Sequence, residues 1–469
     1  MAEDGEGDRS TGGRRSRTDL TQGSVFSHLI RFIVPMSFGI TAMMAVGLID
    51  AFWLGRLSTE ALAAVSFAVP VSFAVFAIFI GLSSGCVAAV ARVVSSGDHD
   101  RIARLATDGV LLSLTVSIVA AVIGTVATRP LFVFIGAEGA TLEQAVGYMQ
   151  IWFLGLVFVS APVIAGAILR AIGQAVLPSA LMIVSAAVNM ILDPLMIFGL
   201  GPFPRLEVAG AAYATVIANA VSATLVLGFM IFRERLLTLA PVAWSVLARH
   251  WREIARVGIP AAGSNAINPI SLTFVIAALA TFAAASDEAV AGFGAASRIE
   301  MFAIIPMFAL SAAMAPVTGQ NLGGGRIDRV REAFRSGFLI AVGWGLVTAA
   351  ALALLAPLLA AGFNEDPDTR AAMRLYLWII PVTNWGYGVV IAASAGFNGL
   401  SRPMPALAMT VFRSLILMAG GCWLGGYLMG APGVFLGVAA ANLIGGVFAG
   451  GWTLFTAFPP RRTEPAPAE

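Results

Sequence analysis

The stretch Asn189-Met-Ile-Leu-Asp193-Pro194-Leu-Met-Ile-Phe-Gly199 places an amide and a carboxylate four residues apart within a long apolar run. Four residues are about one helical turn, so both side chains would lie on one face of a helix. An ionisable group is costly in lipid, and intramembrane acids commonly mark a transport path. The stretch therefore predicts a buried polar site inside a helical membrane protein.

The composition supports a membrane protein with many spans. The 469 residues are 58% hydrophobic and 12% charged, with a mean hydropathy of +0.88, whereas a soluble chain carries about 25% charged residues. The apolar runs are too long for barrel strands, so we predict an all-α polytopic protein of twelve transmembrane helices. The expected spans are residues 27–54, 61–91, 105–128, 146–170, 178–200, 210–232, 258–283, 289–318, 334–361, 373–397, 404–427 and 433–456.

The arginines between the spans are distributed unequally. If the spans alternate in direction, most of them fall on one side, including Arg92, Arg252 and Arg329, and few, such as Arg129, fall on the other. Positive charge accumulates on the cytoplasmic side of membrane proteins. We therefore expect a multi-pass protein of the inner cell membrane with both termini cytoplasmic, and disordered polar tails at 1–25 and 459–469.

The chain contains an internal repeat. A shift of 228 residues places Ser83 over Ser311, Gly97 over Gly325 and Tyr148 over Tyr376. The repeat unit holds an even number of helices, so both copies enter the membrane in the same direction. We predict two six-helix lobes, 26–236 and 258–458, facing each other across a central cleft.

An amphipathic segment connects the two predicted lobes. Residues 237–257 combine apolar residues at helical spacing with arginines between them, which predicts a helix lying on the cytoplasmic membrane surface or a solvated loop helix. The apolar positions are Trp244, Leu247, Trp251 and Ile254, and the basic ones are Arg249, Arg252 and Arg256.

The first lobe holds a candidate cation site. Asp50, Asn189, Asp193 and Thr215 would supply oxygen ligands for a hard cation, and two neighbouring carboxyl groups would equally suit a proton. Other interpretations stay open at this stage. Asp193 could end a helix before Pro194, Asp50 could pair with Arg56, and Thr215 could bond to its own helix.

The second lobe offers fewer chemical groups. Glu300 is its main intramembrane acid and lies beside Arg298, and a structural buried pair is as good an explanation of them as a transport role. Met43, Met44, Phe73 and Tyr387 form a candidate substrate cleft, although such residues more often serve packing. No G-x-x-x-x-G-K-[ST] motif is present, so transport energy would come from an ion gradient.

Several motifs together resemble the multidrug and toxic compound extrusion (MATE) family, nearer the DinF-like than the NorM-like branch. They are Asp50-Ala-Phe-Trp-Leu-Gly55-Arg56, Asn189-Met-Ile-Leu-Asp193-Pro194, Gly210-Ala-Ala-Tyr-Ala-Thr215, Ser297-Arg298-Ile299-Glu300 and Gly319-Gln320-Asn321-Leu322-Gly323. The resemblance implies a V-shaped pair of lobes and a first-lobe cation site at Asp50, Asn189, Asp193 and Thr215. At the position of a NorM-like second-lobe glutamate this chain has Asn268, so the resemblance implies that the first lobe carries the coupling. Asn268, Arg298 and Glu300 are candidates for a second-lobe polar site.

The resemblance implies a secondary antiporter that exports amphipathic, often cationic compounds in exchange for H⁺ or Na⁺. We expect no enzyme activity, no cofactor besides the coupling ion, no metal site beyond one for Na⁺, and no nucleic-acid partner. The expected partners are a drug-like small molecule and the bilayer, and the expected state is a monomer. A lipid or cell-wall-precursor flippase is the main alternative, with Arg170, Arg298 and Arg413 as its few basic candidates, and an intramembrane aspartyl enzyme is the other.

Overall fold

The computed structural model describes residues 19–238, 240–363 and 365–456, and all regular elements in these ranges are helices. The predicted tails therefore lie largely outside the described residues. The first lobe contains α1 (Val25–Leu57), α2 (Thr59–Val94), α3 (His99–Phe134), α4 (Gly139–Leu154), α5 (Leu156–Ala171), α6 (Val176–Phe198), α7 (Val208–Gly228) and the π-helical turn η1 (Phe229–Arg233).

The second lobe follows the same order of spans. It contains α8 (Trp244–Phe282), α9 (Ser286–Ala303), α10 (Ile305–Gly323), α11 (Ile327–Phe363), α12 (Pro367–Ile379), η2 (Pro381–Thr383), α13 (Asn384–Gly399), α14 (Pro403–Val411), the π-helix η3 (Phe412–Met418), α15 (Ala419–Met429) and α16 (Ala431–Thr456).

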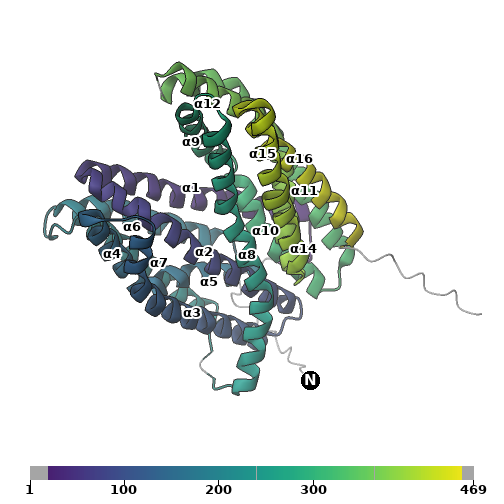
Figure 1. The fold of residues 1–469 in the computed structure, drawn as a ribbon. Helices are drawn as coiled ribbons and strands as arrows, with labels where there is room; N and C mark the ends of the chain where they lie inside the picture. The colour runs from purple at the N-terminus through teal and green to yellow at the C-terminus, as the bar shows by residue number, and fades with distance from the viewer. Residues whose placement is uncertain (1–18, 239, 364, 457–469) are drawn as a thin grey trace, which may run out of the picture.

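The helices combine into twelve apolar spans across the described ranges. Ten are long and apolar enough to cross a membrane singly or as continuous runs, and two more arise from the bent pairs α4–α5, at 51°, and α9–α10, at 45°. The two lobes diverge from one another as the arms of a V (Figure 1). The predicted fold class is confirmed.

Helices α3 and α11 begin earlier than the predicted spans 105–128 and 334–361. The Asp98 carboxylate accepts a hydrogen bond from the Arg101 backbone N–H at 3.0 Å and caps α3 ahead of its apolar part. Gly97 and Gly325, matched by the repeat, both have positive φ, at 71° and 69°. A left-handed turn residue before the cap therefore explains why glycine recurs at this position in both lobes.

The lobes meet through small residues in the second half of α2. Gly81 faces Gly258 and Ala262 of α8 so closely that a Cβ at Gly81 would overlap the α8 backbone. Gly319 of α10 lies so close to Ala91 that a Cβ at Gly319 would come within 2.9 Å of the Ala91 Cβ. Small residues allow this close approach of helices within a membrane. The contacts lie toward the predicted cytoplasmic side, and the lobes diverge toward the opposite side (Figure 1).

Polar groups of the Gly319–Gly323 motif close the same junction. Gln320 and Asn321 are fully buried. Gln320 Nε2 donates to the Ala171 carbonyl of the first lobe at 2.7 Å, and Asn321 Nδ2 donates to the Leu20 carbonyl at 3.1 Å. We call this junction the seam: the glycine contacts of α2 together with the hydrogen bonds of Gln320 and Asn321.

The amphipathic segment is continuous with a membrane span. Residues 244–257 form the first part of the 39-residue helix α8, so the structure has no separate surface helix at this position in the described chain. Helix α8 as a whole packs on α2 and α3, whereas Trp244 at its start is 70% exposed. A position of this segment on the membrane surface stays a prediction. Ile254 is buried in a hydrophobic core of the first lobe, and Val257 is also buried.

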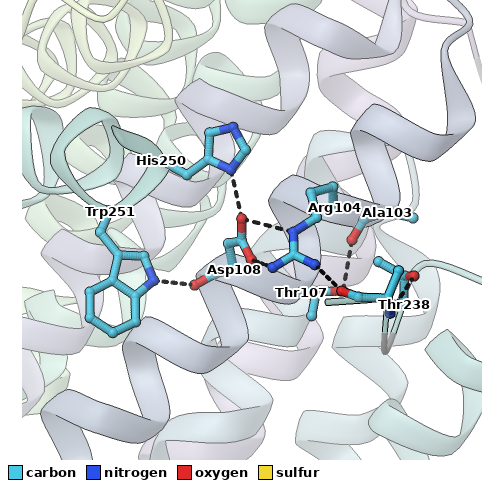
Figure 2. A network of polar contacts seen from close by, with 8 residues as sticks. Ala103, Arg104, Thr107, Asp108, Thr238, His250 and Trp251 are labelled. Carbon is cyan, nitrogen blue, oxygen red and sulfur yellow. Dashed lines mark hydrogen bonds and ion pairs between the residues drawn. The ribbon is translucent and has the colours of Figure 1, made fainter. Parts of the chain in front are cut away.

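A buried carboxylate ties this part of α8 to α3 (Figure 2). Asp108 is fully buried and accepts hydrogen bonds from Arg104 Nη2 at 2.6 Å and Arg104 Nε at 3.2 Å. His250 Nδ1 lies 2.6 Å from Asp108 Oδ2, and Trp251 Nε1 donates to the Asp108 carbonyl at 3.0 Å. We call these four residues the Asp108 clamp.

Asp108→Ala should destabilise the protein by roughly 1–3 kcal/mol, because the partly buried Arg104 and His250 would lose the carboxylate that accepts from both of them. Thermal unfolding of the purified protein in one detergent measures the effect. Asp328→Ala is the matched control, since its side chain is 82% exposed and pairs only with Arg331 at 3.4 Å in the described chain. Equal unfolding temperatures for the two variants would contradict a structural role of the clamp.

Candidate functional site

Three helices of the first lobe bring the predicted cation ligands together. Asp193 and Asn189 lie on one face of α6, and both are buried, Asp193 completely. Asn189 Nδ2 lies 3.4 Å from Asp193 Oδ1 and 3.3 Å from the Thr215 hydroxyl of α7. Asp50 of α1 completes the group, because its carboxyl lies within hydrogen-bonding reach of Asp193. We call these four residues the first-lobe cluster.

The cluster contains more acceptors than donors. Asp193 Oδ2 is buried and receives no hydrogen bond from an N–H or O–H group of the described residues. With its amide turned, Asn189 instead donates to Asp50 Oδ1 at 3.2 Å and accepts from the Thr215 backbone N–H at 3.3 Å. In neither orientation can one amide serve both carboxyl groups fully. Two carboxyl groups in contact in an apolar interior require a shared proton or a bound cation.

The alternative roles for these residues find no support in the described contacts. Pro194 lies inside α6, which continues to Phe198, so Asp193 does not end the helix. The Arg56 guanidinium lies 4.6 Å from the Phe52 ring centre and forms no ion pair with Asp50 in the described chain. Pro194 cannot donate a backbone hydrogen bond, which leaves α6 locally weaker beside the cluster.

Tyr148 of α4 joins the surroundings of the cluster, and sequence reasoning did not assign it a role. It lies close enough to Asp50 and Asp193 to interact electrostatically with both carboxyl groups. The repeat offered a signal, because it matches Tyr148 with Tyr376. In the second lobe, Tyr376 donates its hydroxyl to the Glu300 carboxylate. Each lobe thus holds a tyrosine beside its buried acid.

Glu300 forms the centre of a second polar group. It is 8% exposed on α9 and accepts from the Tyr376 hydroxyl of α12 and from Asn384 Nδ2 of α13, the latter at 2.5 Å. Arg298 is exposed, and no contact in the described chain joins it or Asn268 to Glu300. The predicted trio Asn268, Arg298 and Glu300 is therefore not assembled in this structure.

Arg413 is the basic residue of this second group and was considered from sequence only as a flippase residue. Its Nε and Nη2 donate to Asn442 Oδ1 at 3.1 and 2.7 Å, and its guanidinium stacks 3.8 Å from the Tyr387 ring centre. The residue lies in η3, where a π-helical turn displaces side chains from regular α-helical positions. Arg413 lies within electrostatic range of Glu300 but forms no direct ion pair with it in the described residues.

The predicted cleft residues differ in their surroundings. Met43 is 36% exposed and Phe73 is 61% exposed. Met44 and Tyr387 are half-buried, and the Arg413 guanidinium covers one face of the Tyr387 ring. The side chains of Met43, Met44 and Phe73 are at least partly exposed apolar surface. The Tyr387 ring instead packs against the Arg413 guanidinium.

Comparison with known proteins identifies the family. The MatE family model matches residues 35–195 and 260–424, one segment in each lobe. The chain belongs to the MATE family. A crystal structure of a MATE in complex with MaL6 superposes with a TM-score of 0.86 at 26% identity, covering 94% of this chain and 98% of the other.

The relatives of this chain include one named as an FAD transporter and others named as multidrug resistance or export proteins. The FAD transporter of Shewanella oneidensis is 31% identical over 433 residues, which are 92% of this chain and 95% of the relative. The probable multidrug resistance protein NorM of Thermotoga maritima is 25% identical and covers 81% of this chain and 82% of its own length. MATE proteins are transporters and not enzymes, so the aspartyl enzyme is excluded. The DinF-like branch stays a prediction.

Thr215→Val should weaken the cluster without removing a charge. The variant loses the hydroxyl that contacts Asn189, and a lost hydrogen bond of about 1 kcal/mol corresponds to a roughly 3- to 10-fold weaker apparent affinity for the coupling cation. The cation concentration that gives half-maximal transport measures it. Asn219→Ala is the control, since Asn219 Nδ2 donates to the Thr215 carbonyl of its own helix at 2.8 Å. A larger effect for Asn219→Ala would place the site elsewhere.

Proposed function

We propose that this MATE protein is a secondary antiporter that exports small amphipathic molecules and takes up H⁺ or Na⁺ at the first-lobe cluster. Both termini face the cytoplasm, and the protein resides in the inner cell membrane. The observation that carries the proposal is the contact between the carboxyl groups of Asp50 and Asp193, beside Asn189 and Thr215. Such a group can hold a cation in one conformation and release it in another.

The coupling follows from the cation requirement of the pair. A ligand shifts a conformational equilibrium only by its different affinity for the two states. When the cluster is empty of both proton and cation, the carboxyl groups repel and favour any state in which α1 and α6 separate. Loading removes the repulsion and stabilises the packed arrangement of the two helices. Alternation between these states links cation entry to substrate exit.

Amphipathic drugs are the first substrate class that we propose. Exposed apolar surface at Met43 and Phe73, together with half-buried Met44, supports it, because methionine and aromatic side chains adapt to differently shaped molecules. Relatives named as multidrug proteins, such as the NorM of Thermotoga maritima, support the same class. A lipid flippase keeps the same architecture, but none of the named relatives favours it.

Export of a flavin dinucleotide is a second candidate function. The Shewanella oneidensis protein with this named activity shares 31% of its residues with the chain over nearly its whole length, against 25% for the multidrug relative. The two activities make opposite demands on charge, since drugs of the first class are often cationic and a dinucleotide is anionic. Both would use the same cation cluster for energy.

Asp193→Asn should abolish ion-driven efflux while leaving the fold intact, because an amide keeps the size of the carboxyl but cannot bind a proton or cation in the same way. Ethidium efflux from energised cells measures activity, and membrane abundance and elution profile measure folding. Asp328→Asn serves as a control, since Asp328 is exposed and far along the chain from the cluster. Full efflux by Asp193→Asn would refute the coupling assignment.

Proteoliposomes with imposed H⁺ or Na⁺ gradients identify the coupling ion. We expect one gradient to stimulate substrate flux severalfold and the stimulation to disappear in Asp193→Asn. In the Glu300→Gln variant the ion gradient should still stimulate substrate flux, even if the maximal rate of transport falls. The reason is that Tyr376 and Asn384 donate hydrogen bonds to Glu300 and Arg413 lies nearby, so protein groups and not an exchangeable ion compensate this carboxylate. Loss of stimulation in Glu300→Gln alone would move the coupling site to the second lobe.

A further inference from the structure

Three arginines share the exposed side of the first part of α8. Arg249, Arg252 and Arg256 are spaced by three and four residues, so their side chains lie along one side of the helix. All three are exposed, whereas Ile254 and Val257 on the other side are buried. No ion pair joins the three arginines to an acid in the described part of the chain. We call these three residues the arginine face.

The acidic groups of this region already have partners. Residues 244–257 contain one acid, Glu253, and its carboxylate accepts a hydrogen bond from Arg92 Nη2 of α2. Asp108 of α3 is fully buried and is engaged by the arginine and the histidine of the Asp108 clamp. Neither acid neutralises the arginine face, which therefore presents three uncompensated positive charges on one side of the helix.

The Asp108 clamp fixes the level of the arginine face in the membrane. Residues 109–128 of α3 are uncharged and are followed by Arg129, and a stretch of about 20 apolar residues crosses the hydrocarbon core. Asp108 thus marks the level at which this core begins. His250 and Trp251 of α8 contact Asp108, so the same level crosses α8 there. At 1.5 Å per residue, the arginine face lies within about 8 Å of this level along the helix axis, which is the depth of the headgroup layer.

The exposed residues on either side of the arginine face fit this level. Ile259 is 72% exposed and follows Gly258, which touches α2 at the seam, so its side chain faces outward at the depth of the acyl chains. At the other end, Trp244 is 70% exposed and its ring centre lies 5.8 Å from that of Trp251. Tryptophan and basic residues both favour the headgroup level. The first turns of α8 project past the first lobe (Figure 1), which leaves this surface uncovered by the described chain.

We propose that the arginine face binds the phosphate groups of anionic phospholipids on the predicted cytoplasmic side of the membrane. Guanidinium groups match phosphate oxygens with parallel hydrogen bonds, and each basic side chain near an anionic membrane surface adds to the attraction. The acyl chains of the bound lipid would lie along the apolar surface that begins at Ile259. Lipid binding needs neither an ion gradient nor a substrate, so the inference is independent of the proposed antiport.

Two lipids with the same acyl-chain dansyl tag test the proposal: phosphatidylglycerol (PG), which is anionic, and phosphatidylcholine (PC), which is zwitterionic. Energy transfer from the protein's tryptophans to the tag measures binding in mixed detergent micelles. The wild type should bind PG at least 10-fold more tightly than PC. A triple variant, Arg249→Gln, Arg252→Gln and Arg256→Gln, should weaken PG binding 10- to 100-fold and leave PC binding unchanged. Equal affinities of the wild type for the two lipids, or unchanged PG binding in the variant, would overturn the proposal.

Two further triple variants control for net charge and for folding. Arg101→Gln, Arg235→Gln and Arg326→Gln remove three exposed arginines outside the arginine face and should change PG affinity less than 2-fold. A loss comparable to that of the first variant would reveal only a net-charge effect and would refute the site. Lysine at the three positions of the arginine face keeps the charge, so this variant should still prefer PG to PC. A lysine variant as weak as the glutamine variant would contradict binding by charge.

Inorganic phosphate has the phosphate chemistry without the acyl chains. At constant ionic strength, millimolar phosphate should not displace tagged PG, and displacement would assign the arginine face to soluble phosphate compounds instead of lipid. Lipid binding and transport can fail separately. A wild type that prefers PG but shows no ion-driven flux keeps the lipid site and loses the antiport. Ion-driven ethidium export by a protein without a preference for PG keeps the antiport and loses the lipid site.

Discussion

The contact between the carboxyl groups of Asp50 and Asp193 constrains the first lobe more than any other interaction. Asp193 is fully buried and Asp50 is half-buried, so solvent access to the pair is limited, and Asn189 cannot satisfy both carboxyl groups. A proton or a cation must therefore accompany the pair whenever α1 and α6 are packed together. This requirement makes the packing of two helices depend on a small ion, which is the physical basis of the coupling that we propose for the lobe.

The seam determines which contacts join the two lobes while the helices of the first lobe respond to the ion. Gly81 and Gly258 bring the backbones of α2 and α8 together without side chains that interlock, and the buried Gln320 holds the junction through directional hydrogen bonds. Leu20 and Arg329 add further hydrogen bonds to the junction, since the Leu20 backbone N–H donates to Gln320 Oε1 at 3.2 Å and Arg329 Nη1 donates to the Gly23 carbonyl at 2.8 Å. The Asp108 clamp attaches the first part of α8 to α3, so that part moves with the first lobe unless the clamp also opens.

Much of the fold and part of the candidate site could be predicted from the sequence, for identifiable reasons. The four-residue spacing of Asn189 and Asp193 specifies a shared helix face without knowledge of any other helix. Asp50 could be added only because it is one of the few intramembrane acids of the first lobe, since nothing local relates α1 to α6; the family resemblance then supported the same grouping. The amphipathic pattern around Trp251 could not predict that its indole N–H donates to the Asp108 carbonyl, because that partner comes from a different helix, α3. Arg413 was assigned no place beside Glu300, because its partners Asn442 and Tyr387 come from two other spans.

The two tyrosines at matched positions of the repeat allow the surroundings of the buried acids in the two lobes to be compared. Tyr148 and Tyr376 occupy matched positions and each stands beside a buried acid, yet the acids come from unmatched positions. In the second lobe, Tyr376, Asn384 and the nearby charge of Arg413 accompany the carboxylate permanently. In the first lobe no such resident cation exists among the described residues, so the corresponding charge has to come from solution. Two lobes of common architecture thus differ in whether their buried acid is compensated by a fixed arginine or by an exchangeable ion, and only the exchangeable kind can couple transport to a gradient.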